Sequence, residues 1–297
     1  MDFKTYRIQP WQLAQRQGLD LNVKEKLSDQ RSRAFYEHFR GEVYVSFSGG
    51  KDSTVLLHKV RQVYPNVLGV FIDTGLEYPS VREFVKTMKN IIIVKPKLSF
   101  RDVINKYGYP VVSKENAQKL YEIKNTKSDK LRNKRLHGDD NKNGKLPEKY
   151  KYLIDAPFMI SSKCCDALKK SPVKKFERET GLHPIVGIMA EDSGMRTTSY
   201  LRTGCNTFES KRPMSLPIAF WTDKDIWEYI KKYNLKYADI YNKGYDNTGC
   251  MFCMFGVQFE KAPNRFQRMK EIHPKQYNYC INKLGCGEVL DFMGIKY

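Results

Sequence analysis

The chain has 297 residues, 41% of them hydrophobic, which is enough for one large folded domain or two smaller ones and argues against disorder throughout. Lys and Arg number 52 against 33 Asp and Glu, so the formal net charge is +19. No apolar run approaches the roughly 20 residues of a membrane span. The N-terminal residues do not resemble a signal peptide. We therefore expect a cytoplasmic protein with no membrane partner.

The charge excess predicts an anionic partner without identifying it. Nucleic acid, nucleotides and acidic proteins are all attracted to such a chain. A soluble enzyme from a Lys-rich proteome shows the same excess. Both interpretations stay open, and nucleic acid is one of the partners that we consider.

Residues 1–40 are predicted to form a helical lead-in, because their apolar side chains fall mostly on one helical face. Strands and helices then alternate. Strands are expected at 43–47, 67–72, 91–94 and 185–189. Helices are expected after a Ser/Gly turn at 48–50, over 80–89, and from Thr222, where Thr222 and Asp225 form a capping-box pattern. This order indicates parallel βαβ units and an α/β fold.

The sequence predicts three regions: the lead-in, a nucleotide-binding α/β domain at 41–235, and a C-terminal Cys-x-x-Cys region at 236–297. A basic insertion at 113–152 interrupts the second region. Positions 118–151 hold eleven basic and five acidic side chains, and 11 − 5 leaves an excess of six. We expect an exposed, mobile segment, either an arm that faces nucleic acid or a solvated loop.

The turn at residues 48–53 has the features of a phosphate-binding loop. Gly49 and Gly50 let the backbone approach phosphate oxygens, and the following helix offers free N–H groups and a positive dipole end. Ser48 and Ser53 add hydroxyl donors, and Lys51 adds a positive charge. Asp52 suits a bound Mg²⁺. We predict Lys51 and Asp52 as catalytic residues. The pattern is not the usual NTPase loop.

Ser-Gly-Gly-Lys-Asp-Ser resembles the pyrophosphatase loop of the adenine nucleotide alpha hydrolase superfamily. Three more stretches are similar to motifs of the phosphoadenosine phosphosulfate (PAPS) reductase family within that superfamily. They are Asp73-Thr74-Gly75-Leu76-Glu77-Tyr78-Pro79, Gly187-Ile188-Met189-Ala190-Glu191-Asp192-Ser193 with Arg196, and Phe220–Trp227. The resemblance implies a three-layer sandwich with a mainly parallel sheet, and adenine nucleotide bound near the loop, Asp73, Thr74, Gly187 and Arg196.

The chain departs from the family pattern in two places. Met189 stands where the pattern has Arg, which weakens the case for a phosphate contact there. The reductases' Glu-Cys-Gly-Leu/Ile-His tail is missing, and Cys286 is a weak substitute for its nucleophile. In this superfamily an intact loop accompanies cleavage of ATP to AMP and pyrophosphate, whereas reductases carry a degraded one.

The seven cysteines are not expected to form disulfides in a reducing compartment. Cys164-Cys165 precede Cys250-x-x-Cys253 by a long gap, an order found in sulfonucleotide reductases that bind a [4Fe–4S] cluster. Thiolates suit both Fe–S clusters and zinc. The resemblance favours iron–sulfur at Cys164, Cys165, Cys250 and Cys253, with zinc as the alternative. Cys205 is a further candidate that would replace one of the first pair.

Three functions follow from these features. The first is ATP-dependent activation of an acceptor, such as nucleic acid, for sulfur transfer, with a sulfur donor as protein partner. The second is reduction of an adenylated sulfonucleotide to sulfite, with a reductant protein as partner. The third is a nucleotide- or nucleic-acid-binding regulator without catalysis. The intact loop favours the first function.

Overall fold

The computed structural model describes residues 7–297, so residues 1–6 of the expected lead-in lie outside the description. Residue contacts divide the chain into two compact units. Unit 1 holds the described residues up to Asp73, with Tyr78–Val94 and Val173–Thr248. Unit 2 holds Thr74–Glu77, Lys95–Pro172 and Gly249–Tyr297. The domain boundaries expected after residues 40 and 235 stay predictions.

Unit 1 is built on a six-stranded sheet within the described residues, in the order β3-β2-β1-β5-β7-β6. The strands are β1 (Val43–Ser46), β2 (Leu68–Ile72), β3 (Ile91–Val94), β5 (His183–Val186), β6 (Asn206–Thr207) and β7 (Met214–Ser215). Neighbouring strands are parallel, except that β6 and β7 are antiparallel. The predicted α/β fold with a mainly parallel sheet is confirmed. The strand expected at 185–189 lies at residues 183–186.

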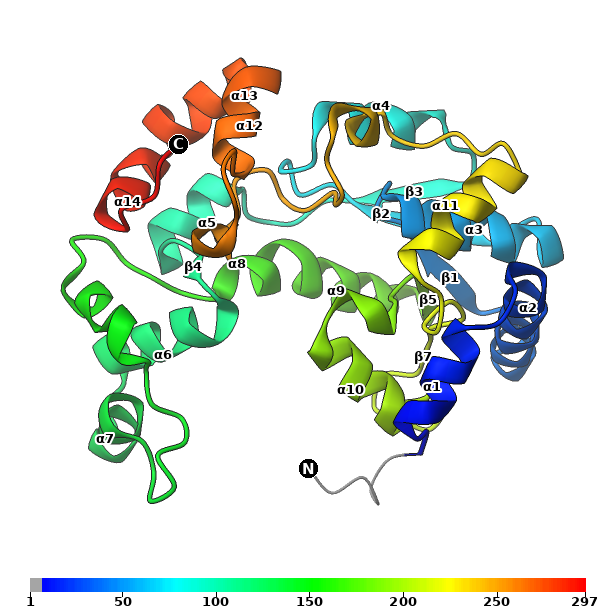
Figure 1. Cartoon of the computed structure of the whole chain (residues 1–297), viewed down its shortest axis with the longest axis horizontal. Helices are drawn as coiled ribbons and strands as arrows, with labels where there is room; N and C mark the ends of the chain where they lie inside the picture. The colour runs from blue at the N-terminus through cyan, green and yellow to red at the C-terminus, as the bar shows by residue number, and fades with distance from the viewer. Residues whose placement is uncertain (1–6) are drawn as a thin grey trace. The chain divides into compact units, whose positions relative to one another are not determined.

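Helices cover both faces of this sheet (Figure 1). Tyr44 and Val70 pack against Phe176 of α9 (Ser171–Thr180). The helix α3 (Lys51–Val63) lies on the opposite face. A Cβ added to Gly69 of β2 would lie 3.5 Å from the Leu57 side chain of this helix. Successive residues of a strand point to opposite faces. Because successive residues of these strands are apolar, both faces of the sheet are buried under helices, which gives three layers.

The other helices of unit 1 include the expected lead-in. They are α1 (Pro10–Gln17), α2 (Leu21–His38), α4 (Pro79–Thr87), α10 (Gly194–Thr203) and α11 (Asp223–Lys232). The capping box predicted at Thr222 is present, with the Asp225 carboxylate accepting from the Thr222 amide at 2.7 Å. Asp225 also forms a buried ion pair with Lys24 at 2.6 Å, which joins α11 to α2.

Unit 2 is mainly helical. Its helices are α5 (Phe100–Tyr107), α6 (Lys114–Asn125), α7 (Asp129–His137), α8 (Lys163–Cys165), α12 (Arg265–Ile272), α13 (Pro274–Asn278) and α14 (Cys286–Phe292). Shorter helical turns lie at Glu148–Asp155, Asp166–Lys170, Val257–Phe259 and Tyr279–Lys283. Two short strands, β4 (Val111–Val112) and β8 (Met254–Phe255), pair in parallel.

Unit 1 also has short helical turns, at Ala190–Asp192 and Asp239–Lys243.

The stretch at 113–152, expected as an exposed, mobile segment, is folded and partly buried. This stretch forms α6 and α7, and Ala117 and Leu120 of α6 are fully buried. Many of its charges are paired locally, as in the ion pair of Arg135 with Glu122 at 2.5 Å. The sparse apolar residues of α6 recur at helical spacing and bury one face, a pattern that the charge count concealed.

Within residues 7–297, no helix is long and apolar enough to cross a bilayer.

Candidate functional site

The loop between β1 and α3 is held in shape by its own hydroxyl groups. The Ser48 amide donates to the Ser53 hydroxyl at 3.1 Å, and that hydroxyl donates to the Gly50 carbonyl at 2.9 Å. Thr54 donates to the same carbonyl at 2.9 Å. Ser48 and Ser53, predicted as phosphate donors, are therefore also the residues that fix the loop's conformation.

The two glycines of the loop are required by its close contacts. Gly49 has φ = +73°, and an added Cβ would lie 2.8 Å from side-chain atoms of Val81 and Val85 in α4. A Cβ on Gly50 would lie 2.6 Å from the Thr248 hydroxyl. Both distances are too short for a real side chain, so the loop packs with its bare backbone against α4 and the Thr248 segment.

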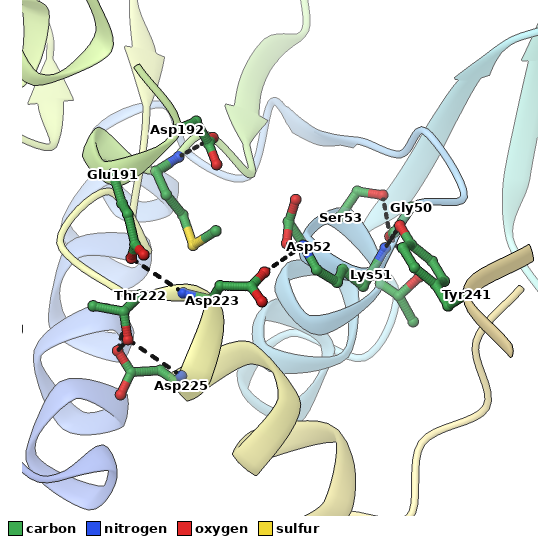
Figure 2. A network of polar contacts seen from close by, with 12 residues as sticks. Gly50, Lys51, Asp52, Ser53, Glu191, Asp192, Thr222, Asp223, Asp225 and Tyr241 are labelled. Atoms are coloured by element: carbon green, nitrogen blue, oxygen red, sulfur yellow. Dashed lines mark hydrogen bonds and ion pairs between the residues drawn. The ribbon is translucent and has the colours of Figure 1, made fainter. Parts of the chain in front are cut away.

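Lys51 lies at the start of α3 between two carboxylates, and its side chain is 5% exposed. Its ammonium group is 2.7 Å from Asp223 and 3.0 Å from Asp52 (Figure 2). Burial alone would lower the pKa of Lys51, but the hydrogen bond to Asp223 and the charge of Asp52 raise it above its ordinary value. Lys51 is therefore a permanent positive charge at the beginning of the helix.

Acidic groups gather around Asp52. Burial raises the pKa of Asp52, the charge of Lys51 opposes this, and the nearby carboxylates of Asp192 and Asp223 raise it further. Gly187 passes so close to α3 that an added Cβ would lie 3.2 Å from the Asp52 carbonyl oxygen. The structure thus brings Lys51, Asp52 and Gly187 together, and their roles at a nucleotide stay predictions. Carboxylate oxygens of this kind are the ligands that Mg²⁺ prefers.

Tyr241 closes over the first turn of α3. Its hydroxyl accepts from the Lys51 amide at 2.8 Å (Figure 2). The same hydroxyl lies beside Gly50 and Thr248. The first amides of a helix have no partner within the helix and are the groups that bind phosphate. Tyr241 therefore occupies one of the donors that a nucleotide phosphate would use.

The other residues predicted for the nucleotide have partners of their own. Asp73 forms an ion pair with Arg82 of α4 at 2.9 Å. The Thr74 hydroxyl, in unit 2, donates to Glu77 at 2.6 Å. Arg196 is exposed and pairs with Asp192. The charge of Asp192 in turn raises the pKa of Asp52. A role for these residues in binding nucleotide stays a prediction.

Several neighbours of the loop were not predicted. Asp223 lies in the first turn of α11, within the Phe220–Trp227 stretch that resembles a family motif, but the sequence assigns it no role. Asp192 lies within the Gly187–Ser193 stretch, but the sequence assigns it no role. Tyr241 and Thr248 lie about 190 positions after the loop, and no local pattern connects them with it. Met189 stands where the family pattern has Arg. Its side chain is buried and carries no charge.

The four predicted cysteine ligands all lie in unit 2. Burial raises the pKa of Cys164, and the charges of Cys165, Cys250 and Cys253 raise it further. Cys250 and Cys253 form a tight turn in which the Cys253 amide donates to the Cys250 carbonyl at 3.1 Å. All four are free thiols. The predicted ligands Cys165, Cys250 and Cys253 therefore influence Cys164 electrostatically within unit 2.

Lys169, which the motifs did not indicate, donates a hydrogen bond to the Cys250 thiol. It follows Cys164-Cys165 in the same helical stretch. A positive charge beside several thiols favours their thiolate forms, the forms that bind metal. The donor set is soft enough for an iron–sulfur cluster or zinc. However, no three His, Cys, Asp or Glu side chains in residues 7–297 are already arranged as metal ligands.

The remaining cysteines have different surroundings. Cys205 lies in unit 1 and hydrogen-bonds with Arg31 and Tyr200. Cys280 and Cys286 are both buried in unit 2 and hydrogen-bond to each other. Burial of Cys286 makes it unsuitable as a nucleophile that meets substrate.

Comparison with known proteins gives the family. The model of the phosphoadenosine phosphosulfate reductase domain matches residues 42–255. An uncharacterised protein of Methanocaldococcus jannaschii is 30% identical over 243 residues, which cover 80% of this chain and 41% of the relative. A second one is 25% identical over 268 residues, covering 88% of this chain and 52% of the relative. The chain thus spans about half the length of these two relatives.

An adenosine 5′-phosphosulfate reductase of Bacillus cereus is 25% identical over 228 residues, covering 75% of this chain and 77% of the enzyme. Two solved structures align with TM-scores of only 0.41. They are a phosphoadenylyl-sulfate reductase of Candida auris (16% identity, 70% of this chain, 81% of the other) and a [4Fe–4S] U34-tRNA thiolase of Methanococcus maripaludis (13%, 89%, 79%). Because the family model covers most of the chain, this protein belongs to the phosphoadenosine phosphosulfate reductase family.

Proposed function

We propose that this protein cleaves ATP to AMP and pyrophosphate in order to activate an acceptor for sulfur transfer. The observation that carries the proposal is the complete loop, in which a buried Lys51 lies between Asp52 and Asp223 at the start of α3. A sulfonucleotide has no pyrophosphate to release. A fixed positive charge and a nearby acidic group suit a reaction in which pyrophosphate leaves with Mg²⁺.

In the proposed reaction, an oxygen of the acceptor attacks the α-phosphorus of ATP. The bond between the α- and β-phosphates breaks, and pyrophosphate leaves. The acceptor oxygen is then an AMP ester, which a sulfur nucleophile displaces with release of AMP. Lys51 and the first amides of α3 would neutralise charge on the phosphates, and Asp52 would hold Mg²⁺. Nucleic acid remains the acceptor that the net charge of +19 favours.

The cysteine group of unit 2 would hold the iron–sulfur cluster of this enzyme. Its ligands would be Cys164, Cys165, Cys250 and Cys253, with Lys169 as a neighbouring charge. Such a cluster, when bound, supplies iron that can carry electrons or bind sulfur. The proposal for ATP cleavage does not depend on the cluster.

A second function is favoured by one observation. The Bacillus cereus relative is an adenosine 5′-phosphosulfate reductase, and the alignment covers three quarters of both chains. Such a reductase would need a nucleophile that takes up the sulfur group. The late cysteines of this chain, Cys280 and Cys286, are buried, which argues against it.

One experiment separates the two functions. Anaerobically purified protein is incubated with α-labelled ATP and Mg²⁺, with and without transfer RNA or DNA, and the products are resolved. We expect equimolar pyrophosphate and labelled AMP, which stays esterified to the acceptor until a sulfur nucleophile displaces it. Replacing Lys51 with Met should reduce the rate about 10²- to 10³-fold, as for other lost transition-state donors.

The matched control is Lys86→Met, which removes an exposed charge from α4 and should leave the rate unchanged. Sulfite formed from a sulfonucleotide and a thiol reductant, with no turnover of ATP, would contradict the first function and support the second.

A further inference from the structure

A cavity of about 280 Å³ lies in unit 1 and shares no lining residue with the nucleotide loop. Its walls come from α1 and the segment before it, from α2, and from residues 204–208 at and around β6. The Ile8 amide donates to the Leu201 carbonyl at 2.9 Å, which holds the segment before α1 against α10. Gly204, with φ = +73°, turns the chain so that Cys205 lines the cavity.

Three arginines line this cavity: Arg7, Arg16 and Arg31. No acidic side chain is among the lining residues, and within residues 7–297 none of the three arginines forms an ion pair. Most other buried or half-buried cations of the chain have an acidic partner, as Lys24 and Lys51 do. Three guanidinium groups around one cavity create a local positive potential that an anion would relieve.

The arginines are held in place by neutral partners. Arg16 donates to the Tyr200 hydroxyl at 2.7 Å, and Arg7 donates to the Thr203 carbonyl at 3.3 Å. Arg31 hydrogen-bonds the Cys205 sulfur, and its carbonyl accepts from Asn206 at 2.9 Å. A guanidinium has five N–H donors, so each arginine keeps donors for a ligand. The groups are thus positioned before any ligand arrives, which favours binding.

We propose that this cavity binds a tetrahedral oxyanion, a phosphate or sulfate group, either as a free ion or as part of a nucleic acid. Arg fits such groups because its planar fork donates two parallel hydrogen bonds. The cavity volume is at the lower end for ligand pockets, which suits a single oxyanion better than a whole nucleotide. The site is separate from the nucleotide loop, and the proposal does not rest on ATP cleavage.

Cys205 lines the cavity and keeps 7% of its surface exposed, so its alkylation, slow because the thiol is buried, provides a local test. The protein is treated with iodoacetamide, and the rate of alkylation at Cys205 is followed by peptide mass spectrometry. The rate is compared in the absence of ligand, with inorganic phosphate, with inorganic sulfate, and with transfer RNA. A bound anion should slow the reaction at Cys205, because it fills the cavity that the thiol lines.

The test variants are Arg7→Gln and the double variant Arg7→Gln/Arg31→Gln. Each lost charge-assisted contact should raise the dissociation constant of the protecting anion roughly tenfold. Arg33→Gln, an exposed arginine of the same helix as Arg31, should keep the protection. Arg7 is exposed, so the single variant provides the answer if the double variant does not fold.

Protection by inorganic phosphate or sulfate that the Arg7 and Arg31 variants lose supports a site for a free oxyanion. Protection by transfer RNA alone, with the same loss, supports a site for nucleic-acid phosphate. Absence of protection by all three ligands overturns the proposal. Equal protection in the native protein and both Arg variants also overturns it. Turnover of ATP is a separate measurement, so the two proposals fail independently.

Discussion

At the scale of single residues, phosphate binding by the loop depends on which groups already accept hydrogen bonds from its backbone amides. The Lys51 amide already donates to the Tyr241 hydroxyl at 2.8 Å. A phosphate oxygen that takes this amide must displace Tyr241. The hydroxyl therefore competes with the nucleotide for one of the amides at the start of α3.

Replacing Tyr241 with Phe should tighten ATP binding, because the competing acceptor is removed. A neutral hydrogen bond contributes about 0.5–1.5 kcal/mol, so the dissociation constant should fall roughly two- to tenfold. Equilibrium dialysis with labelled ATP measures it. Tyr237→Phe is the control, since Tyr237 bonds Asn242 in the same segment. Weaker binding by Tyr241→Phe would show instead that the hydroxyl contributes to the nucleotide complex.

His58 of α3 makes stability depend on pH. Its ring nitrogen lies 2.9 Å from the Tyr229 hydroxyl, and burial, aided by the charge of Lys59, lowers its pKa below the ordinary 6.5. The unfolded chain therefore takes up the proton first as the pH falls. Unfolding free energy should decrease as the pH drops below about 6.5.

His58→Gln keeps a hydrogen-bonding group and should flatten this dependence between about pH 7 and pH 5. Urea denaturation at several pH values measures it. Some slope should remain, because the pKa of His183 is also lowered by burial. His137→Gln, at an exposed position, is the control. An unchanged slope in His58→Gln would exclude His58 as the source.

At the scale of elements, the position of the loop depends on contact between its backbone and α4. Gly49 has a positive φ, and an added Cβ would meet Val81 and Val85 at 2.8 Å. Substitution therefore combines backbone strain with a clash inside a packed region. Local sequence signals predicted the turn but not the helix that packs on it.

Gly49→Ala should lower the unfolding free energy by about 2–4 kcal/mol, from strain and overpacking together. Chemical denaturation measures the change. Gly194→Ala is the matched control, because no atom lies within 4 Å of its added Cβ and its φ is not positive. That variant should be neutral or slightly stabilising. If both variants had the same stability, the close packing at Gly49 would not matter.

At the scale of the whole molecule, the two predicted sites lie in different units. The predicted nucleotide loop belongs to unit 1, and the four predicted cysteine ligands belong to unit 2. Cys205 belongs to unit 1, where its hydrogen-bonding partners are Arg31 and Tyr200. We therefore expect the metal group to involve the cysteines of unit 2 alone.

Anaerobically prepared protein should be brown and contain iron and sulfide. Cys253→Ser should lose most of the iron, whereas Cys205→Ser should keep it, as measured by metal analysis and absorbance. Loss of iron from Cys205→Ser would make Cys205 a ligand after all. A colourless native protein with stoichiometric zinc would replace the cluster by a zinc site. Removal of iron with a chelator should leave ATP binding intact.

The sequence alone determined the parts of this protein that depend on neighbouring residues. Short apolar runs predicted the strands, the loop motif predicted the turn before α3, and Thr222 with Asp225 predicted the start of α11. Each signal lies within a few positions, because hydrogen bonds of helices, caps and tight turns are local. The composition of α6 misled, because charge outnumbered its few buried residues.

Only the tertiary structure decided which distant side chains meet. Asp223 and Tyr241 reach Lys51 across more than 170 positions, and three arginines from two helices and the segment before α1 line one cavity with Cys205. Such contacts depend on how helices pack on the sheet, and no local pattern encodes that packing. The four cysteines had a recognisable spacing, but Lys169 beside them became visible only once the chain was folded.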